Sequence, residues 1–209
     1  MTTYKLTYFG FDGGRGEPIR IACHAAGLEL ADHRISFDEF RATRNDLPFT
    51  AVPVLYIDGV PVTQSNSINR YIGKKAGLYP DDDLQALYCD EVMDAIEDLL
   101  HYIVQTFGLE GDALKAAREK LVDGWLSVFI RGLDRLLARG GGKYFADDRL
   151  TMADLKMFVQ ARSLMAGTLD HVPEDLIGKL APALVEHKER IEKEAVVVAY
   201  YESRKQAGS

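Results

Sequence analysis

One stretch, residues 52–68, constrains the fold of this chain more than any other. Four β-prone residues at 54–57 lead into Asp58-Gly59, and a second β-prone run begins at Val60. An Asp-Gly pair suits a type I′ turn, because both central residues of that turn need a positive φ. The stretch therefore predicts a β-hairpin.

A helix is expected directly after this hairpin. Apolar residues recur at helical spacing through Ile68, Tyr71 and Ile72, and Ser65 is a natural N-cap. A helix N-terminus at the end of a strand carries partial positive charge, so it favours a carboxylate or phosphate. From local sequence alone, an ordinary hairpin packed on a helix is the commoner arrangement. Pro53 opens the hairpin, and either peptide isomer is compatible with that position.

The rest of the first eighty residues mixes strands and helices. Residues 4–9 and 33–37 have strand character. A helix begins at Glu17, where the following proline costs no hydrogen bond, and stops at Gly27. Residues 40–47 form a loop or short helix before the hairpin. This order predicts a mixed sheet that contains one parallel pair of strands and one hairpin.

A boundary follows at residues 77–83, which combine Gly, Pro and three consecutive acids. Beyond it, apolar residues recur every three or four positions and strand patterns vanish. The chain therefore predicts an α/β domain over residues 1–80 with a mixed four-stranded sheet, and an all-helical domain over residues 84–209. The helices are expected at 84–103, at 114–137, after Thr151, from Pro173 and at 183–194.

Two details of the helical part are predicted from spacing. Thr151 stands three residues before Asp154, the spacing of a capping box, and the helix that follows should be buried. Trp125 lies in register with the apolar positions of its helix and is expected in the core.

Composition limits the partners and the compartment. The net charge is −7, and residues 81–209 hold 16 basic and 24 acidic residues against nine and eight in residues 1–80. An acidic helical part argues against nucleic acid or an anionic membrane as partner, and leaves the first part as the better place for a small anion. Cys23 and Cys89 have no metal-ligand spacing and indicate reduced thiols. Without a signal peptide or membrane-length apolar run, a cytoplasmic protein is expected.

A set of motifs in the first eighty residues occurs together. They are Tyr4–Phe9, Arg15 with Glu17, Asp32–Ile35, Leu47–Phe49, Val52–Leu55, Asp58-Gly59 and Gln64-Ser65. In this register the chain resembles the cytosolic glutathione transferases, most closely the sigma class, which includes the haematopoietic prostaglandin D synthase type. The chain has one extra residue in the loop Gly10–Gly14, and Thr151–Asp154 resembles the capping box of that family.

The resemblance implies a thioredoxin-like N-terminal domain, a helical C-terminal domain and a homodimer that conjugates glutathione to apolar electrophiles. The Tyr8 hydroxyl would donate a hydrogen bond to the glutathione sulfur, with Arg15 assisting. The chemistry needs the thiolate, because an ordinary thiol titrates near pH 8.5. A hydroxyl that donates to the sulfur favours its charged form.

The resemblance also implies two sets of contacts. The residues expected to bind glutathione, in addition to Tyr8, are Phe40, Arg44, Val52, Pro53, Gln64, Ser65 and Asp98. Asp98 would reach the glutathione that is bound by the partner subunit. The electrophile site falls on Phe9, Gly14, Leu100 and Gln105. Phe40 and Arg44 stand where the class usually has Trp and Lys, and Ala51 where it commonly has Lys or Gln, so one contact to glutathione is absent.

Other functions remain open on sequence grounds. Prostaglandin-type relatives place a Trp where this chain has Gln105, so conjugation is favoured over prostaglandin isomerisation. A non-catalytic carrier or crystallin-like relative is disfavoured by Tyr8, although Ala51 is compatible with it. A thiol-disulfide transferase needs a cysteine at the end of the first strand, which this chain lacks.

No tightly bound cofactor and no metal are expected. Asp94 and Glu97, close to Asp98, resemble acids that hold a divalent cation in some relatives. Taken singly, Tyr8 is more typical of a strand interior, and Arg15 of a solvated loop. Only the combination of motifs favours an active site.

Overall fold

The structure of the chain is a computed structural model that describes residues 1–207. It divides into two compact units. The first is Met1–Tyr79 together with helix α10 (Ala195–Ala207), and the second is Pro80–Glu194. The last helix therefore groups with the α/β part, whereas the sequence assigned it to the helical domain over residues 84–209.

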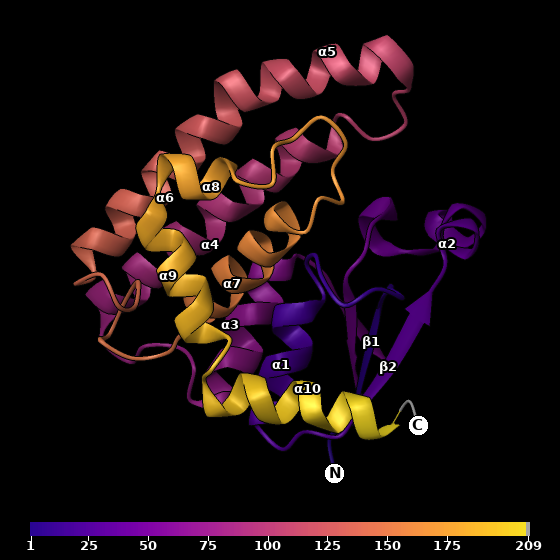
Figure 1. Ribbon diagram of the computed structural model, residues 1–209. Coiled ribbons are helices and arrows are strands. Elements are labelled where there is room, and N and C mark those ends of the chain that lie inside the picture. The colour runs from indigo at the N-terminus through magenta and orange to yellow at the C-terminus, as the bar shows by residue number, and fades with distance from the viewer. Residues whose placement is uncertain (208–209) are drawn as a thin grey trace. The chain divides into compact units, whose positions relative to one another are not determined.

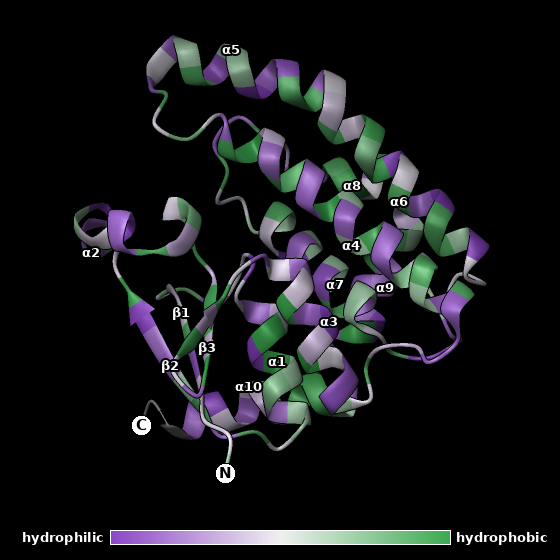
Figure 2. Cartoon of the chain, turned by 180° about the vertical axis from the view of Figure 1, so that it is seen from behind, coloured by the Kyte–Doolittle hydropathy of each residue, from purple (hydrophilic) through white to green (hydrophobic). Residues whose placement is uncertain are grey.

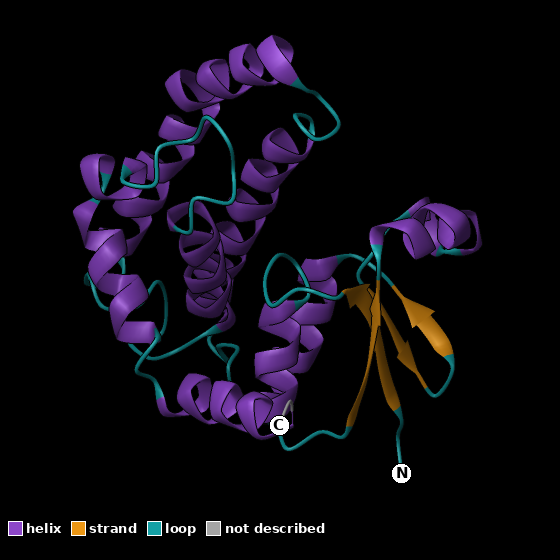
Figure 3. Cartoon of the chain, turned by 45° about the vertical axis from the view of Figure 1, so that its right-hand side comes forward, coloured by secondary structure: helices purple, strands orange, loops and turns teal. Residues whose placement is uncertain are grey.

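The first unit contains one four-stranded sheet, in the order β2-β1-β3-β4 (Figure 3). Its strands are β1 (Tyr4–Phe9), β2 (Leu30–Ile35), β3 (Val54–Ile57) and β4 (Val60–Val62). β1 pairs parallel with β2 and antiparallel with β3, and β3 pairs antiparallel with β4. The predicted mixed sheet is therefore confirmed. The second strand lies earlier than the expected 33–37, because Ser36 already caps the next helix.

The hairpin forms as its sequence predicts. Asp58 has a φ of 49° and Gly59 a φ of 83°, so both central residues of the turn are in the left-handed region. The Thr3 backbone N–H donates to the Asp58 carboxylate at 2.8 Å, which ties the turn to the N-terminal segment. Figure 2 colours β2 as largely hydrophilic, as suits a strand at the edge of a sheet.

Four helices complete this unit. They are α1 (Glu17–Ala25), α2 (Phe37–Thr43), α3 (Ser65–Ala76) and α10, with 3₁₀ turns at Arg44–Asp46 and Pro48–Thr50. α1 packs on α3 and on α10, as Figure 1 shows. Helix α10 was not predicted, because three consecutive valines at 196–198 favour a strand. Packing on α1 overrides that local preference.

The second unit is helical. Its helices are α4 (Asp83–Val104), α5 (Gly111–Leu121), α6 (Ser127–Arg139), α7 (Met152–Met165), α8 (Leu176–Leu180) and α9 (Pro182–Ile191). A π-helical turn at Val122–Leu126 joins α5 to α6, so the single helix expected over 114–137 is interrupted at Gly124. In residues 1–207, no helix is long and apolar enough to cross a membrane.

The interruption explains a wrong prediction. Trp125 is 52% exposed rather than part of the core, and its ring stacks on Tyr102 with the centroids 5.0 Å apart. Helical spacing assumed an unbroken turn through this residue. The wide turn changes the direction in which Trp125 points.

Helix α7 is central to this unit and is buried on nearly all sides, as expected. Its capping box is present. The Asp154 carboxylate accepts from the Thr151 backbone N–H at 2.8 Å, from the Phe145 N–H at 3.0 Å and from His187 Nε2 at 2.9 Å. One fully buried acid thus joins α7 to α9 and to the preceding loop.

Candidate active site

The register of the sheet brings three of the predicted site residues together at one edge, the one formed by strand ends. Thr7 of β1 pairs with Val54 of β3, so the next position aligns Tyr8 with Pro53. Leu55 pairs with Val62, so the same register continued aligns Pro53 with Gln64. The carboxyl end of β1, the start of β3 and the residues after β4 therefore meet at this edge of the sheet.

Tyr8 is held by the loop that follows β1. Its side chain is buried, and its hydroxyl oxygen accepts a hydrogen bond from the Arg15 backbone N–H at 2.9 Å. A Cβ atom on Gly14 would collide with the Tyr8 hydroxyl, and one on Gly16 would collide with the ring. Gly14 also has a φ of 59°. The glycines of this loop let its backbone lie directly against the tyrosine.

The cation over the Tyr8 ring belongs to a residue that the sequence interpretation missed. The guanidinium carbon of Arg20 lies 5.7 Å from the ring centroid. Arg20 is only 3% exposed and pairs with the buried Glu17 one helical turn earlier, at 3.3 Å. An oppositely charged pair at i,i+3 on the helix after β1 is the signal that could have identified it.

The N-terminus of α3 differs in detail from the prediction. Ser65 is the first helical residue rather than the N-cap, and Gln64 takes the cap position with a φ of 67°. A positive φ is costly for a residue with a side chain and is concentrated at functional sites. The Val52–Pro53 peptide bond is cis, and Pro53 is buried while Val52 is half-buried.

Aromatic residues gather where β1 and β2 end. The Phe9 ring lies 5.3 Å from that of Phe40 and 4.6 Å from that of Phe37. The Arg44 guanidinium carbon lies 5.4 Å from the Phe40 ring centroid. Phe40 and Arg44, both expected near glutathione, are thus neighbours, and Phe9 of the expected electrophile site belongs to the same cluster. Ala51 is exposed.

Comparison with known proteins decides the family. Residues 4–74 match the sequence model "Glutathione S-transferase, N-terminal domain", and residues 97–204 match "Glutathione S-transferase, C-terminal domain". The chain belongs to the glutathione S-transferase family. The expected family and fold class are therefore confirmed.

Individual members of this family are similar along nearly their whole length. Glutathione S-transferase 3 of Caenorhabditis elegans is 30% identical and matches over 86% of this chain and 88% of its own. The solved prostaglandin synthase D of Nilaparvata lugens has a TM-score of 0.84 at 28% identity, over 97% and 98% of the two chains. A Necator americanus glutathione S-transferase described as monomeric has a TM-score of 0.76 at 29% identity, over 97% of each chain.

Two predicted site residues of this family member, Asp98 and Leu100, lie on α4 in the second unit, and Gln105 is the C-cap of that helix. Asp98 is exposed and Leu100 is half-buried. Gln105 is exposed, and its amide nitrogen lies 2.8 Å from His101 Nε2. These residues belong to the second unit, so their assigned contacts depend on the resemblance alone.

Helix α4 also carries the acids considered for a cation. Lys156, which is buried, donates from Nζ to a Glu97 carboxylate oxygen at 2.5 Å and to the Met93 carbonyl at 3.1 Å. The ammonium group therefore already neutralises Glu97. Within the described part of the chain, no group of three or more His, Cys, Asp or Glu side chains could hold a metal ion.

Neither cysteine of this family member has the character of a nucleophile. Cys23 and Cys89 are both buried, and loss of solvation raises the pKa of each thiol to about 12. A thiol reacts through its thiolate, which is scarce when the pKa is so high. Both thiols are therefore expected to be unreactive in the folded chain.

Proposed function

We propose that this chain conjugates the thiolate of glutathione to apolar electrophiles, and that Tyr8 stabilises the thiolate. The observation that carries this proposal is the hydrogen bond from the Arg15 backbone N–H to the Tyr8 oxygen. This bond holds the hydroxyl at the edge of the sheet and polarises it, so that its proton becomes a better donor.

The free energy needed to lower the thiol pKa is close to what one hydrogen bond to the thiolate supplies. Lowering a thiol pKa by about two units corresponds to roughly 2.7 kcal/mol. A hydrogen bond to a charged group contributes about 1.5–3 kcal/mol, so one tyrosine hydroxyl supplies most of the shift. The Arg20 guanidinium also lies beside the Tyr8 ring, where Glu17 and Asp32 balance its charge.

Glutathione itself is the co-substrate, and no tightly bound cofactor is involved. The N-terminus of α3, with Gln64 and Ser65, would hold the γ-glutamyl carboxylate, because helix N-termini favour anions. The backbone of Val52, next to Pro53, would pair with the cysteinyl part. The remaining proposed glutathione contacts are Phe40 and Arg44 at the glycyl end and Asp98 from a partner subunit.

The electrophile would contact apolar or flat surfaces rather than charges. Phe9 and Gly14 lie beside Tyr8 in the first unit. Leu100 on α4 and Gln105 at the C-cap of that helix are the proposed contacts from the helical part. Gln105 is polar and exposed, which suits a broad preference better than a single stacked substrate. The proposed assembly is a cytoplasmic homodimer. Each of its two chains consists of an α/β domain (1–80) and a helical domain (84–209).

The test combines two assays on the purified chain. Retention on immobilised glutathione together with conjugation of a generic aryl halide is expected. Retention without turnover would instead favour a non-catalytic carrier. Size-exclusion chromatography with light scattering should give twice the mass of the 23.3 kDa chain. A single-chain mass would contradict the homodimer and with it the role of Asp98.

Prostaglandin isomerisation is the second candidate, because a solved relative is named prostaglandin synthase D. The two activities are distinguished by supplying a prostaglandin endoperoxide with glutathione. Isomer formation faster than aryl halide conjugation would favour this second candidate over the first.

A further inference from the structure

Four consecutive residues after Tyr8 are each held by an arginine side chain. Arg20 donates to the Phe9 carbonyl at 3.1 Å and to the Phe11 carbonyl at 3.2 Å. Arg34 donates to the Gly10 carbonyl at 2.9 Å and to the Asp12 carboxylate at 2.8 Å. Every residue from Phe9 to Asp12 is thus anchored through its backbone or its carboxylate.

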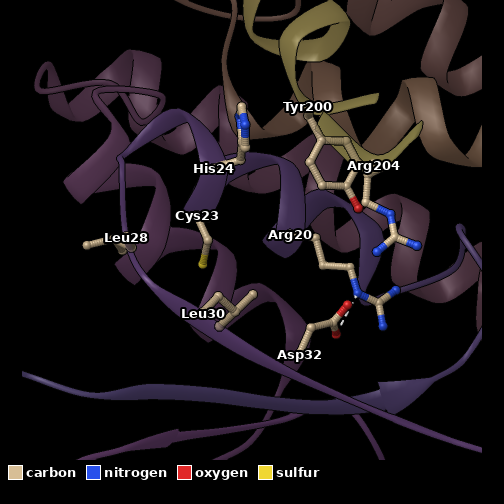
Figure 4. A pocket seen from close by; sticks show the side chains of 8 residues that line it. All are labelled: Arg20, Cys23, His24, Leu28, Leu30, Asp32, Tyr200 and Arg204. Carbon is tan, nitrogen blue, oxygen red and sulfur yellow. Dashed lines mark hydrogen bonds and ion pairs between the residues drawn. The ribbon is translucent and has the colours of Figure 1, made fainter. Parts of the chain in front are cut away.

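A third arginine comes from the C-terminal helix. Arg204 of α10 donates to the same Asp12 oxygen at 3.3 Å. Figure 4 shows Arg204 and Tyr200 on one side of a pocket of about 200 Å³, with Arg20 and Asp32 on the other. The three arginines therefore reach the loop from three elements that are far apart in the sequence, α1, β2 and α10.

Asp32 joins two of these arginines. One of its carboxylate oxygens accepts from Arg20 Nε at 3.0 Å, and the other accepts from Arg34 Nε at 2.7 Å. Each guanidinium is therefore fixed by Asp32 through Nε while its terminal nitrogens hold the loop. With Glu17 and Asp12, the cluster contains three acids for three arginines, so its charges are balanced although Arg20 is buried.

The loop needs such anchors because of its composition. Residues 10–16 include glycine at positions 10, 13, 14 and 16, and glycine loses more conformational freedom on folding than any other residue. The Arg15 N–H lies in the same loop, three residues after the last anchored position. A loop free to sample other conformations would lose the hydrogen bond from Arg15 to Tyr8.

We propose that Arg20, Arg34, Arg204 and Asp32, which we call the arginine clamp, hold the loop at residues 9–12 so that Arg15 polarises Tyr8. This proposal rests on the proposed function. Asp12 is the key residue, because it lies in the part of the loop that carries the one extra residue relative to the resembling family. The C-terminal helix then contributes to thiolate activation from outside the site, through Arg204.

The clamp can be weakened without removing the fold. Asp12 is 38% exposed at its side chain, as is Arg204, and exposed ion pairs contribute little to stability. Asp12→Asn and Arg204→Met should therefore fold like the wild type. Asp175→Asn is the matched control, since it removes an exposed acid of the second unit that pairs with Lys179 at 2.8 Å.

Two readouts test the proposal, and one of them needs no enzymatic activity. Hydrogen exchange of the Arg15 amide should be at least about fivefold faster in Asp12→Asn and Arg204→Met, and unchanged in Asp175→Asn. If the wild type conjugates, the pH profile of kcat/KM for glutathione should move upward by roughly half a pH unit in both clamp variants. The KM for glutathione should change less than about twofold, because none of these residues is expected to contact it.

The outcomes separate the two proposals. A wild type without conjugation contradicts the proposed function, while the exchange measurement still tests whether the clamp holds the loop. Unchanged exchange at Arg15 overturns the clamp. Faster exchange with an unchanged pH profile in an active enzyme also overturns it, because loop order would then have no effect on the thiolate. Arg34→Lys keeps the charge but not the forked geometry, and should fall between the wild type and Arg34→Met.

Discussion

The backbone N–H of Arg15 donates a 2.9 Å hydrogen bond to the hydroxyl oxygen of Tyr8. The resemblance implies that Arg15 assists Tyr8. In the structure its backbone orients the tyrosine, and Arg20 places a cation over the ring. The proposed active site is therefore a tyrosine whose surroundings are built by one glycine-rich loop.

Gly14→Ala should reduce activity through Tyr8. A methyl group at this position would collide with the Tyr8 hydroxyl, and the φ of 59° is unfavourable for alanine by about 1 kcal/mol. Because small misplacements of a catalytic group are costly, we expect kcat/KM to fall at least about tenfold. Steady-state kinetics with an aryl halide measures it.

Gly10→Ala is the matched control for Gly14→Ala. It lies in the same loop, but a Cβ atom there meets nothing within 4 Å. It should keep nearly full activity. Equal losses in both variants would mean that the loop, rather than the contact with Tyr8, is sensitive to substitution.

Gln64→Gly should separate stability from binding. Glycine tolerates the φ of 67° that strains glutamine, so the free energy of unfolding should rise by about 1 kcal/mol. Loss of the side-chain amide should weaken glutathione binding. Urea unfolding and calorimetric titration measure the two effects. Gln64→Ala should weaken glutathione binding as much as Gln64→Gly does, without raising the free energy of unfolding. An equal rise in Gln64→Ala would show that the positive φ of Gln64 does not destabilise the chain.

Asp154→Ala should destabilise the helical unit. The buried carboxylate accepts hydrogen bonds from Thr151, Phe145 and His187, and its removal leaves those donors without an acceptor. The expected loss is about 3–5 kcal/mol, measured by urea unfolding. Asp112→Ala, an exposed acid in the first turn of α5, should cost less than about 1 kcal/mol. Comparable losses would contradict the central role of Asp154.

Neither cysteine should react in the folded chain. Burial raises the pKa of Cys23 and Cys89 to about 12, so both are thiols rather than thiolates at pH 8. Iodoacetamide should label neither residue in the native protein, and both after unfolding in urea, with mass spectrometry as the readout. Rapid native labelling of Cys23 would show that the packing of α1 and α10 opens easily.

Local sequence predicted the parts of the fold that local forces determine. The Asp58-Gly59 turn and the Thr151–Asp154 capping box formed as expected, because each depends on residues adjacent in the chain. Long-range packing decided the rest. It made a helix of the valines in α10. Trp125 became exposed because a π-helical turn interrupts its helix.

The candidate site was predictable to a similar extent. Tyr8, Pro53 and Gln64 were identified by resemblance, and the sheet register brings them to one edge. Ser65 was wrongly predicted as the N-cap, since a strained Gln64 is not a local preference. The arginine clamp was missed because Arg20, Arg34 and Arg204 meet only in the folded chain.

The ionisation of bound glutathione tests the central claim most directly. The thiolate absorbs ultraviolet light, so its formation can be titrated in the complexes of the wild type and of Tyr8→Phe. The account predicts a glutathione thiol pKa about two units below its ordinary value of about 8.5 in the wild type, and a return close to that value in Tyr8→Phe with affinity nearly unchanged. The same titration midpoint in both proteins would contradict it.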